Sequence, residues 1–165
     1  MNGDYGVRAA GPDDCSLIVS FNRAMAMETE GHDLDEGTVV AGVTAVLADP
    51  AKGRYFIAER RGGGPEAGGQ RAVRPEPAGQ LMLTLEWSDW RNGPIWWIQS
   101  VYVAPAHRRR GIYRMLHEHV RRVGRAEGAV GLRLYVERDN STAQSAYGAL
   151  GMARSRYVMY EERWA

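Results

Sequence analysis

Residues 101–113 read Val101-Tyr102-Val103-Ala104-Pro105-Ala106-His107-Arg108-Arg109-Arg110-Gly111-Ile112-Tyr113, and they join an apolar strand to the start of a helix. The first N–H groups of a helix have no carbonyl partner within it, and the helix dipole reinforces their attraction for anions. Gly111 lets the backbone approach a phosphate, and the arginines add charge-assisted hydrogen bonds. The stretch predicts a site for a phosphate-bearing ligand held mainly by backbone, with a solvated basic helix start as the alternative.

Helical and strand patterns alternate on both sides of this stretch. Apolar alternation or apolar runs predict strands at residues 5–9, 54–60, 80–87, 95–103, 132–136 and 157–160. Helices are predicted at residues 15–28 (capped by Asp13 or Asp14), from Asp35 or Glu36 to Asp49-Pro50, at 110–127, and between Asn140 and Gly151. Residues 62–79 are rich in Gly and Pro and are expected to form an exposed loop. This order predicts an α/β fold, a mixed sheet with helices packed on it.

The composition is typical of a globular protein. The chain has 165 residues and a net charge of +1. That length predicts one domain over residues 1–165, and the near-neutral charge argues against bulk binding to nucleic acid or to an anionic membrane. No apolar run is long enough to span a membrane and no secretory signal is recognisable, so the cytoplasm is the expected compartment. A single cysteine excludes an internal disulfide or a cysteine-based zinc site, and no metal site is expected.

A second group of residues follows the last predicted helix start. Asn140 is placed to cap this helix, Tyr147 lies seven residues later on the same face, and Gly151 ends it. A plain helix cap and a core tyrosine are the structural alternatives for the first two residues.

With both groups in place, the chain resembles the GCN5-related N-acetyltransferase (GNAT) superfamily over most of its length. The family's phosphate motif reads Arg or Gln, two residues, Gly, one residue, then Gly or Ala. Arg108 and Gly111 match this motif, whereas Tyr113 replaces the last small residue, and its bulk would alter the angle or strength of cofactor binding. The later Asn140–Ala143–Tyr147–Gly151 pattern matches in full. The resemblance implies the GNAT fold, with about six to seven strands flanked by about four helices.

The resemblance also implies acetyl-CoA as cosubstrate, and it implies roles for particular residues. The pyrophosphate would be held by Arg108, Arg109, Arg110, Gly111, Ile112 and Tyr113. The strand residues Val101, Tyr102 and Val103 would receive the pantetheine arm as an added strand, with the Val101 N–H directed at the thioester oxygen. Asn140 would contact the cofactor arm, and Tyr147 would protonate the departing thiolate.

The amine must also lose a proton. The family often places a glutamate on the strand that enters the phosphate loop, but the corresponding residue here is Gln99, which is not a base. Glu86 is the substitute, acting directly or through water, with a solvated carboxylate as its alternative; Asp89 is a second candidate. Asp13 and Asp14 disfavour the thiolate of Cys15, so direct transfer is preferred to a covalent intermediate.

The resulting prediction is an N-acetyltransferase that acts on a primary amine of a small molecule or of a peptide or protein. A regulatory module that binds acyl-CoA without efficient turnover is the main alternative, and Gln99 and Tyr113 favour it. A contact of the arginines with nucleic acid is the third reading, which the net charge opposes. Family members are often dimers, so a homodimer is one expected assembly.

Overall fold

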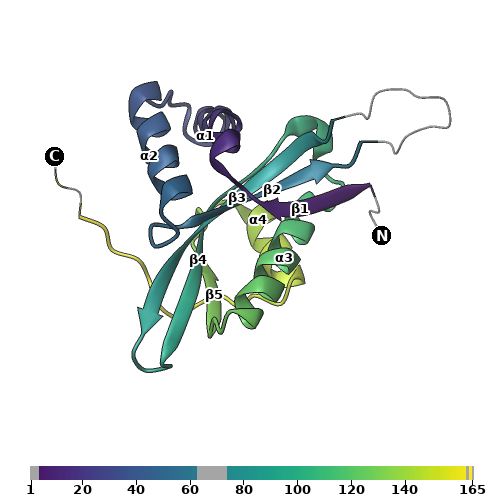
Figure 1. The fold of residues 1–165 in the computed structure, drawn as a ribbon. Coiled ribbons are helices and arrows are strands. Elements are labelled where there is room, and N and C mark those ends of the chain that lie inside the picture. Colours follow the sequence, from purple (N-terminus) through teal and green to yellow (C-terminus); the bar gives the residue numbers. More distant parts are fainter. Residues whose placement is uncertain (1–3, 63–73, 163, 165) are drawn as a thin grey trace. The chain divides into compact units, whose positions relative to one another are not determined.

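The computed structural model describes residues 4–62, 74–162 and 164, and the chain divides into two compact units, Met1–Leu134 and Tyr135–Ala165 (Figure 1). Among the described residues, the first unit holds all strands of the sheet and three α-helices, and the second holds one α-helix. The prediction of one domain over the whole chain stays a prediction.

The first unit is built around a five-stranded sheet. Its strands lie in the order β1 (Tyr5–Ala9), β2 (Arg54–Arg60), β3 (Glu76–Ser88), β4 (Gly93–Val103) and β5 (Gly131–Leu134). Neighbours are antiparallel except β4 and β5, which are parallel. The mixed α/β fold is therefore confirmed, with fewer strands than the six to seven predicted.

The last predicted strand, Tyr157 to Tyr160, is wrong. These residues carry no strand, and all four side chains are more than half exposed. A run rich in aromatic and β-branched residues becomes a strand only where a partner strand and a buried face are available. Neither is present at these residues.

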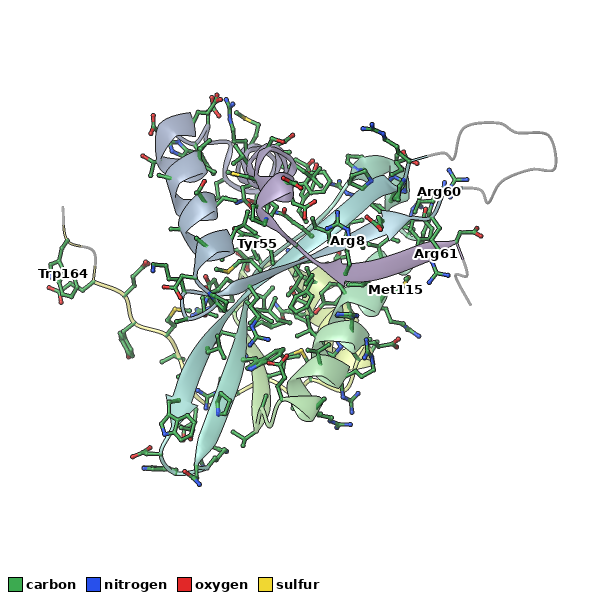
Figure 2. All side chains as sticks on the ribbon, viewed as in Figure 1. Arg8, Tyr55, Arg60, Arg61, Met115 and Trp164 are labelled. Atoms are coloured by element: carbon green, nitrogen blue, oxygen red, sulfur yellow. The ribbon has the colours of Figure 1, made fainter. Side chains whose placement is uncertain are left out.

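Three helices pack against the sheet of the first unit: α1 (Cys15–Glu30), α2 (Glu36–Ala48) and α3 (Ile112–Ala126). Side chains of β2 alternate between two hydrophobic clusters: Tyr55 and Ile57 pack with residues of α1 and α2, whereas Phe56 and Ala58 pack with residues of α3. The labelled side chains Tyr55 and Met115 mark these two clusters (Figure 2). The sheet is thus covered by helices on both faces.

The expected loop at residues 62–79 is only partly supported. Residues 63–73 lie outside the described residues, but 76–79 are the beginning of β3. Gly79 lies so close to β4 that a Cβ there would stand 2.6 Å from the Tyr102 carbonyl oxygen. Glycine at this position therefore serves a close approach of two strands, and composition alone cannot distinguish that role from a loop.

Helix boundaries follow local capping interactions. The Asp35 carboxylate accepts from the Thr38 N–H at the start of α2, as predicted for an N-cap. Asp14 precedes α1 but makes no capping bond to it; its carboxylate accepts from the Gly11 N–H and from Arg8 instead. The α3 helix starts at Ile112, two residues later than predicted, because Gly111 adopts a left-handed conformation.

The Arg8–Asp14 ion pair contributes to the stability of the fold at neutral pH, and this contribution is lost at acid pH. The Arg8 guanidinium, hydrogen-bonded at 2.8 Å, holds the pKa of Asp14 below its usual range. A lowered folded pKa means that the stabilisation is present above the pKa of an unfolded aspartate and is lost as pH falls through the folded value. We expect Asp14→Asn to lower the free energy of unfolding by about 1 kcal/mol at pH 7 and to reduce its loss between neutral and acid pH.

Urea unfolding at several pH values measures this difference. Asp13→Asn removes a neighbouring carboxylate for which the described residues provide no ion pair, so it is the matched control and should behave like the unaltered chain. Parallel pH curves for Asp14→Asn and the unaltered chain would contradict the assignment.

The second unit contains α4 (Ser141–Ala149). The Asn140 side chain accepts from the Ala143 N–H at 2.9 Å, so the predicted N-cap is confirmed. The Gln144 amide donates to the carbonyls of Glu137 and Arg138, which ties the preceding turn to the helix. Gly151 follows the helix with φ +83°, consistent with its predicted role in ending it.

Candidate functional site

The edge of β4 that faces β5 is only partly used by that strand. Register pairs place β5 beside Ile95 to Ile98, and β5 ends at Leu134. From Gln99 to Val103, β4 therefore has β3 on one side and, within the described part of the first unit, no strand on the other.

The backbone groups on this edge include those of Val101 and Val103. The Ala104 N–H donates to the Ala78 carbonyl at 2.9 Å, which makes Ala78 and Ala104 a hydrogen-bonded pair of the antiparallel ladder. Bonded and non-bonded pairs alternate, so the pairs at Val101 and Val103 are non-bonded ones. Their N–H and C=O groups consequently point away from β3, toward the edge that β5 does not reach.

The loop after β4 has an unusual backbone. Pro105–His107 form a 3₁₀ turn, after which Arg109 and Gly111 have φ values of +60° and +76°. Residues with positive φ thus alternate with residues of negative φ, a backbone pattern that can turn N–H groups to one side, where they attract an anion. The first intrahelical bond of α3 runs from the Met115 N–H to the Gly111 carbonyl, so the helix begins where this loop ends. The loop therefore combines both features of a phosphate site that the sequence predicts.

Arg108 is held by the protein itself. Its Nε donates to the Val103 carbonyl at 2.9 Å, and its Nη2 donates to Glu28 at 2.5 Å. The Tyr102 hydroxyl donates to the other oxygen of Glu28 at 2.9 Å. The hydrogen bonds from Arg108 and then Tyr102 hold the pKa of Glu28 below its usual range. Glu28 of α1 is thus linked to the loop, a role that no local sequence signal identifies.

The other predicted loop residues divide by burial. Arg109 and Arg110 are exposed, whereas the Ile112 side chain is buried in the core, which leaves its backbone as the only part able to reach a ligand. The Tyr113 ring lies 6.1 Å from the His117 ring. Tyr113 is the second residue of α3, and its side chain therefore lies along this helix, near the residue four positions later.

His107 is the last residue of the 3₁₀ turn and anchors this turn to the sheet. Its side chain is buried, with Nδ1 at 3.0 Å from the Tyr5 hydroxyl and Nε2 at 3.3 Å from Glu76. Residues from β1 and β3 thus fix the 3₁₀ turn that leads into the loop. No local sequence pattern predicts this support, because the partners are distant along the chain.

Glu86 lies at the other end of β3. One of its oxygens accepts from Arg133 at 2.9 Å and the other accepts from the Trp97 indole. Glu86 pairs with Ile95 and Leu81 pairs with Val101, so Glu86 lies about 16 Å along the strand from the level of Val101. Glu86 was expected to accept the proton of the amine either directly or through water, and this spacing favours a relay through water. Gln99 donates to the Thr84 hydroxyl at 2.7 Å, between these positions.

Tyr147 lies on α4 in the second unit, together with Asn140. Burial raises the pKa of the Tyr147 hydroxyl above its ordinary value, so the phenol stays protonated at neutral pH. The oxygen of Asn140 is engaged in the N-cap, and its amide N–H groups are the part able to contact a ligand.

An open pocket of about 430 Å³ lies between α1, α2 and strands β2 to β4. Its lining includes Ser100, the residue before Val101. The pocket therefore reaches β4 next to the edge described above. Among the described residues, no group of three potential ligands could hold a metal ion, and no helix is long and apolar enough to cross a membrane.

Comparisons with known proteins agree with this architecture. The model of the acetyltransferase (GNAT) family matches residues 49–152. No curated protein sequence matches the chain. The crystal structure of a possible acetyltransferase from Clostridium difficile 630 is 39% identical, with 98% of each chain covered and a TM-score of 0.83.

Two more distant structures share the fold. The aminoglycoside N-acetyltransferase AAC(6')-Iy in complex with CoA is 16% identical, covers 98% of this chain and 95% of its own, and has a TM-score of 0.73. The aminoglycoside acetyltransferase meta-AAC0020, from an uncultured soil metagenomic sample and in complex with sisomicin, is 12% identical, covers 99% of each chain and has a TM-score of 0.76.

Proposed function

This chain belongs to the acetyltransferase (GNAT) family, and we propose that it transfers an acetyl group from acetyl-CoA directly to a primary amine in a ternary complex. As a family member it is an acyltransferase enzyme. The observation that carries the proposal is a strand edge leading directly into an anion-binding loop, that is, β4 followed by Arg108 to Gly111.

Donor binding uses the backbone of these elements. The pyrophosphate is proposed to lie on the N–H groups between Arg108 and Tyr113, with the exposed Arg109 and Arg110 adding charge. The pantetheine arm, an extended chain with two amides, is proposed to pair with the edge groups of Val101 and Val103 beside Tyr102. The CoA complex of the AAC(6')-Iy structure, which shares the fold, supports this choice of cosubstrate.

The reaction needs three contributions from the protein. The amine nitrogen attacks the thioester carbonyl carbon, and the Val101 N–H stabilises the negative charge that develops on its oxygen. The C–S bond then breaks, the nitrogen keeps the acetyl group, and Tyr147 donates its proton to the leaving sulfur. The proton lost by the amine is taken up by a base or by water that leads to one. Asn140 contacts the cofactor arm in this proposal.

Glu86 is proposed as the end of a water relay that accepts the proton. We expect Glu86→Gln to lower kcat about tenfold near neutral pH, because an amide does not accept the proton, while the Kd for acetyl-CoA stays nearly unchanged. Initial rates of thiol release and calorimetric titration with acetyl-CoA measure the two quantities. Asp89→Asn, at the second candidate base on the same hairpin, should leave kcat unchanged, and a loss of kcat there instead would assign the role to Asp89. An unchanged kcat for Glu86→Gln would remove Glu86 from the proton path.

Thiol release with acetyl-CoA and a panel of amines tests the proposed function. Release that depends on the amine supports it. Tight binding of acetyl-CoA in calorimetry without release with any amine would instead support the regulatory module, which Gln99 and Tyr113 favour.

A further inference from the structure

The pocket between α1, α2 and the sheet has a mostly apolar wall. Helices α1 and α2, the connection between them and strand β3 supply Met25, Leu34, Val39, Val43, Val46 and Met82 to it. At about 430 Å³ its volume suits a compact molecule. Such a wall favours a ligand with a hydrocarbon body, because burying apolar surface is the main source of affinity there.

Two uncharged polar side chains of the pocket, those of Asn22 and Tyr55, are hydrogen-bonded to each other. The Asn22 amide donates to the Tyr55 hydroxyl at 3.3 Å, and its oxygen accepts from Gln80 at 2.6 Å. Burial raises the pKa of Tyr55, so this hydroxyl is neutral at physiological pH. This part of the pocket therefore carries no charge and offers few further hydrogen bonds to a ligand.

The connection between α1 and α2 is acidic, but most of its carboxylates are engaged elsewhere. Glu28 pairs with Arg108, Asp33 pairs with Arg23, and Asp35 caps α2. Glu30 lines the pocket, and the described residues provide it with no ion pair or hydrogen bond. The pocket is thus lined by one carboxylate, for which the described part of the chain provides no ion-pair partner.

We propose that the acceptor is a small primary monoamine with an apolar body, which packs on the wall of this pocket while Glu30 attracts its single ammonium group. This inference rests on the proposed function and names its substrate class. Glu30 is a specificity-determining residue here, since it selects and orients the acceptor without touching the thioester. The position of Ser100 in the lining, next to Val101, connects the pocket to the edge proposed for the acetyl group.

Polycationic acceptors fit the same pocket poorly. Each additional ammonium group would leave water without a carboxylate to pair with, and an unpaired buried charge is costly. Aminoglycosides carry several such groups. The chain shares its fold with aminoglycoside acetyltransferases at 12–18% identity. Its pocket is nevertheless expected to take a different class of acceptor.

Steady-state thiol release with five amines of four kinds tests the proposed class of acceptor. Hexylamine and 2-phenylethylamine represent the proposed acceptors, and spermidine, sisomicin and a lysine-containing peptide represent the others. We expect kcat/KM at least about tenfold higher for the monoamines than for any of the others. Equal or better use of sisomicin, spermidine or the peptide would overturn this inference and leave the proposed function standing. Release with none of these amines would count against the proposed function itself.

Glu30→Gln tests the charge. We expect the KM for hexylamine to rise about tenfold, with kcat and the Kd for acetyl-CoA nearly unchanged. Asp13→Asn is the matched control, because it removes the same charge about 24 Å away, beyond the other end of α1. An unchanged KM in Glu30→Gln, or an equal rise in Asp13→Asn, would overturn the role of Glu30.

Gly42→Leu tests the location. Gly42 lines the pocket from α2, and a Cβ there would meet no atom within 4 Å, so the leucine has room to fill the pocket. Leucine also favours a helix more than glycine does, so the melting temperature should not fall. We expect kcat/KM for 2-phenylethylamine to drop at least about tenfold, while Ala41→Leu, on an exposed position of the same helix, leaves it unchanged. Full activity of a folded Gly42→Leu would place the acceptor elsewhere.

Discussion

Tyr147→Phe is expected to lower kcat by about 100-fold or more, while the Kd for acetyl-CoA stays nearly unchanged. The substitution removes one hydroxyl and keeps the ring, so only the proton donor is lost. Without a donor, the sulfur must leave as a thiolate or take its proton from water. Initial rates of thiol release and calorimetric titration with acetyl-CoA measure the two quantities separately.

The pH dependence of this residue provides a second readout. Burial raises the pKa of the Tyr147 hydroxyl above that of a free phenol. A raised pKa keeps the acid protonated over a wider range, so kcat should decline only at alkaline pH, above the ordinary phenol value. In Tyr147→Phe this alkaline decline should disappear along with most of the activity.

Tyr157→Phe is the matched control within the same unit. Tyr157 is 70% exposed, and loss of its hydroxyl should leave kcat unchanged. Equal turnover by Tyr147→Phe and the unaltered enzyme would exclude Tyr147 as the proton donor.

Gly111→Asp is expected to weaken acetyl-CoA binding by about 100-fold. The aspartate would place a negative charge beside the proposed pyrophosphate, and two like charges at about 4–5 Å repel by several kcal/mol at the effective dielectric constant of a protein surface. Calorimetric titration with acetyl-CoA measures the loss. It should be smaller at high salt, because salt screens the repulsion.

Gly111→Asn separates charge from shape. Gly111 has φ +76°, and Asn and Asp tolerate this left-handed conformation better than other residues with side chains. The two variants therefore carry similar steric and conformational costs, and only one of them carries a charge. We expect Gly111→Asn to retain most of the affinity. Equal affinities of Gly111→Asp and the unaltered chain would place the pyrophosphate elsewhere.

Sequence reasoning identified most elements of the fold because their signals are local. The strands at residues 5–9 and 54–60 were predicted with the bounds that the structure has. Asn140 caps the helix that it was expected to cap, and Asp35, one of the two residues expected to open α2, is its N-cap. An N-cap needs only a side-chain oxygen and an N–H three residues later, and a strand needs only its own alternation. The positive-φ loop at Gly111 likewise follows from glycine in a turn.

Long-range contacts were not accessible in the same way. The hydrogen bond from Arg108 to Glu28 joins residues 80 positions apart, and no sequence pattern near either residue predicts it. Arg108 was predicted to hold the pyrophosphate together with the following residues up to Tyr113; in the structure, its Nε and Nη2 donate to the Val103 carbonyl and to Glu28. Residues 157–160 show the opposite error. Their local pattern is typical of a strand, but these residues form none.

The Glu28–Arg108 ion pair connects a helix that lines the pocket proposed for the acceptor to the loop proposed to hold the donor. Coupling between two ligand sites is a free energy, and it is reciprocal. If occupation of the pocket displaces α1 and alters this ion pair, the affinity for acetyl-CoA changes by a certain factor. Bound acetyl-CoA must then change the affinity for the amine by the same factor. Through this one contact, the strength with which each substrate favours or disfavours binding of the other becomes a property that Glu28 can set.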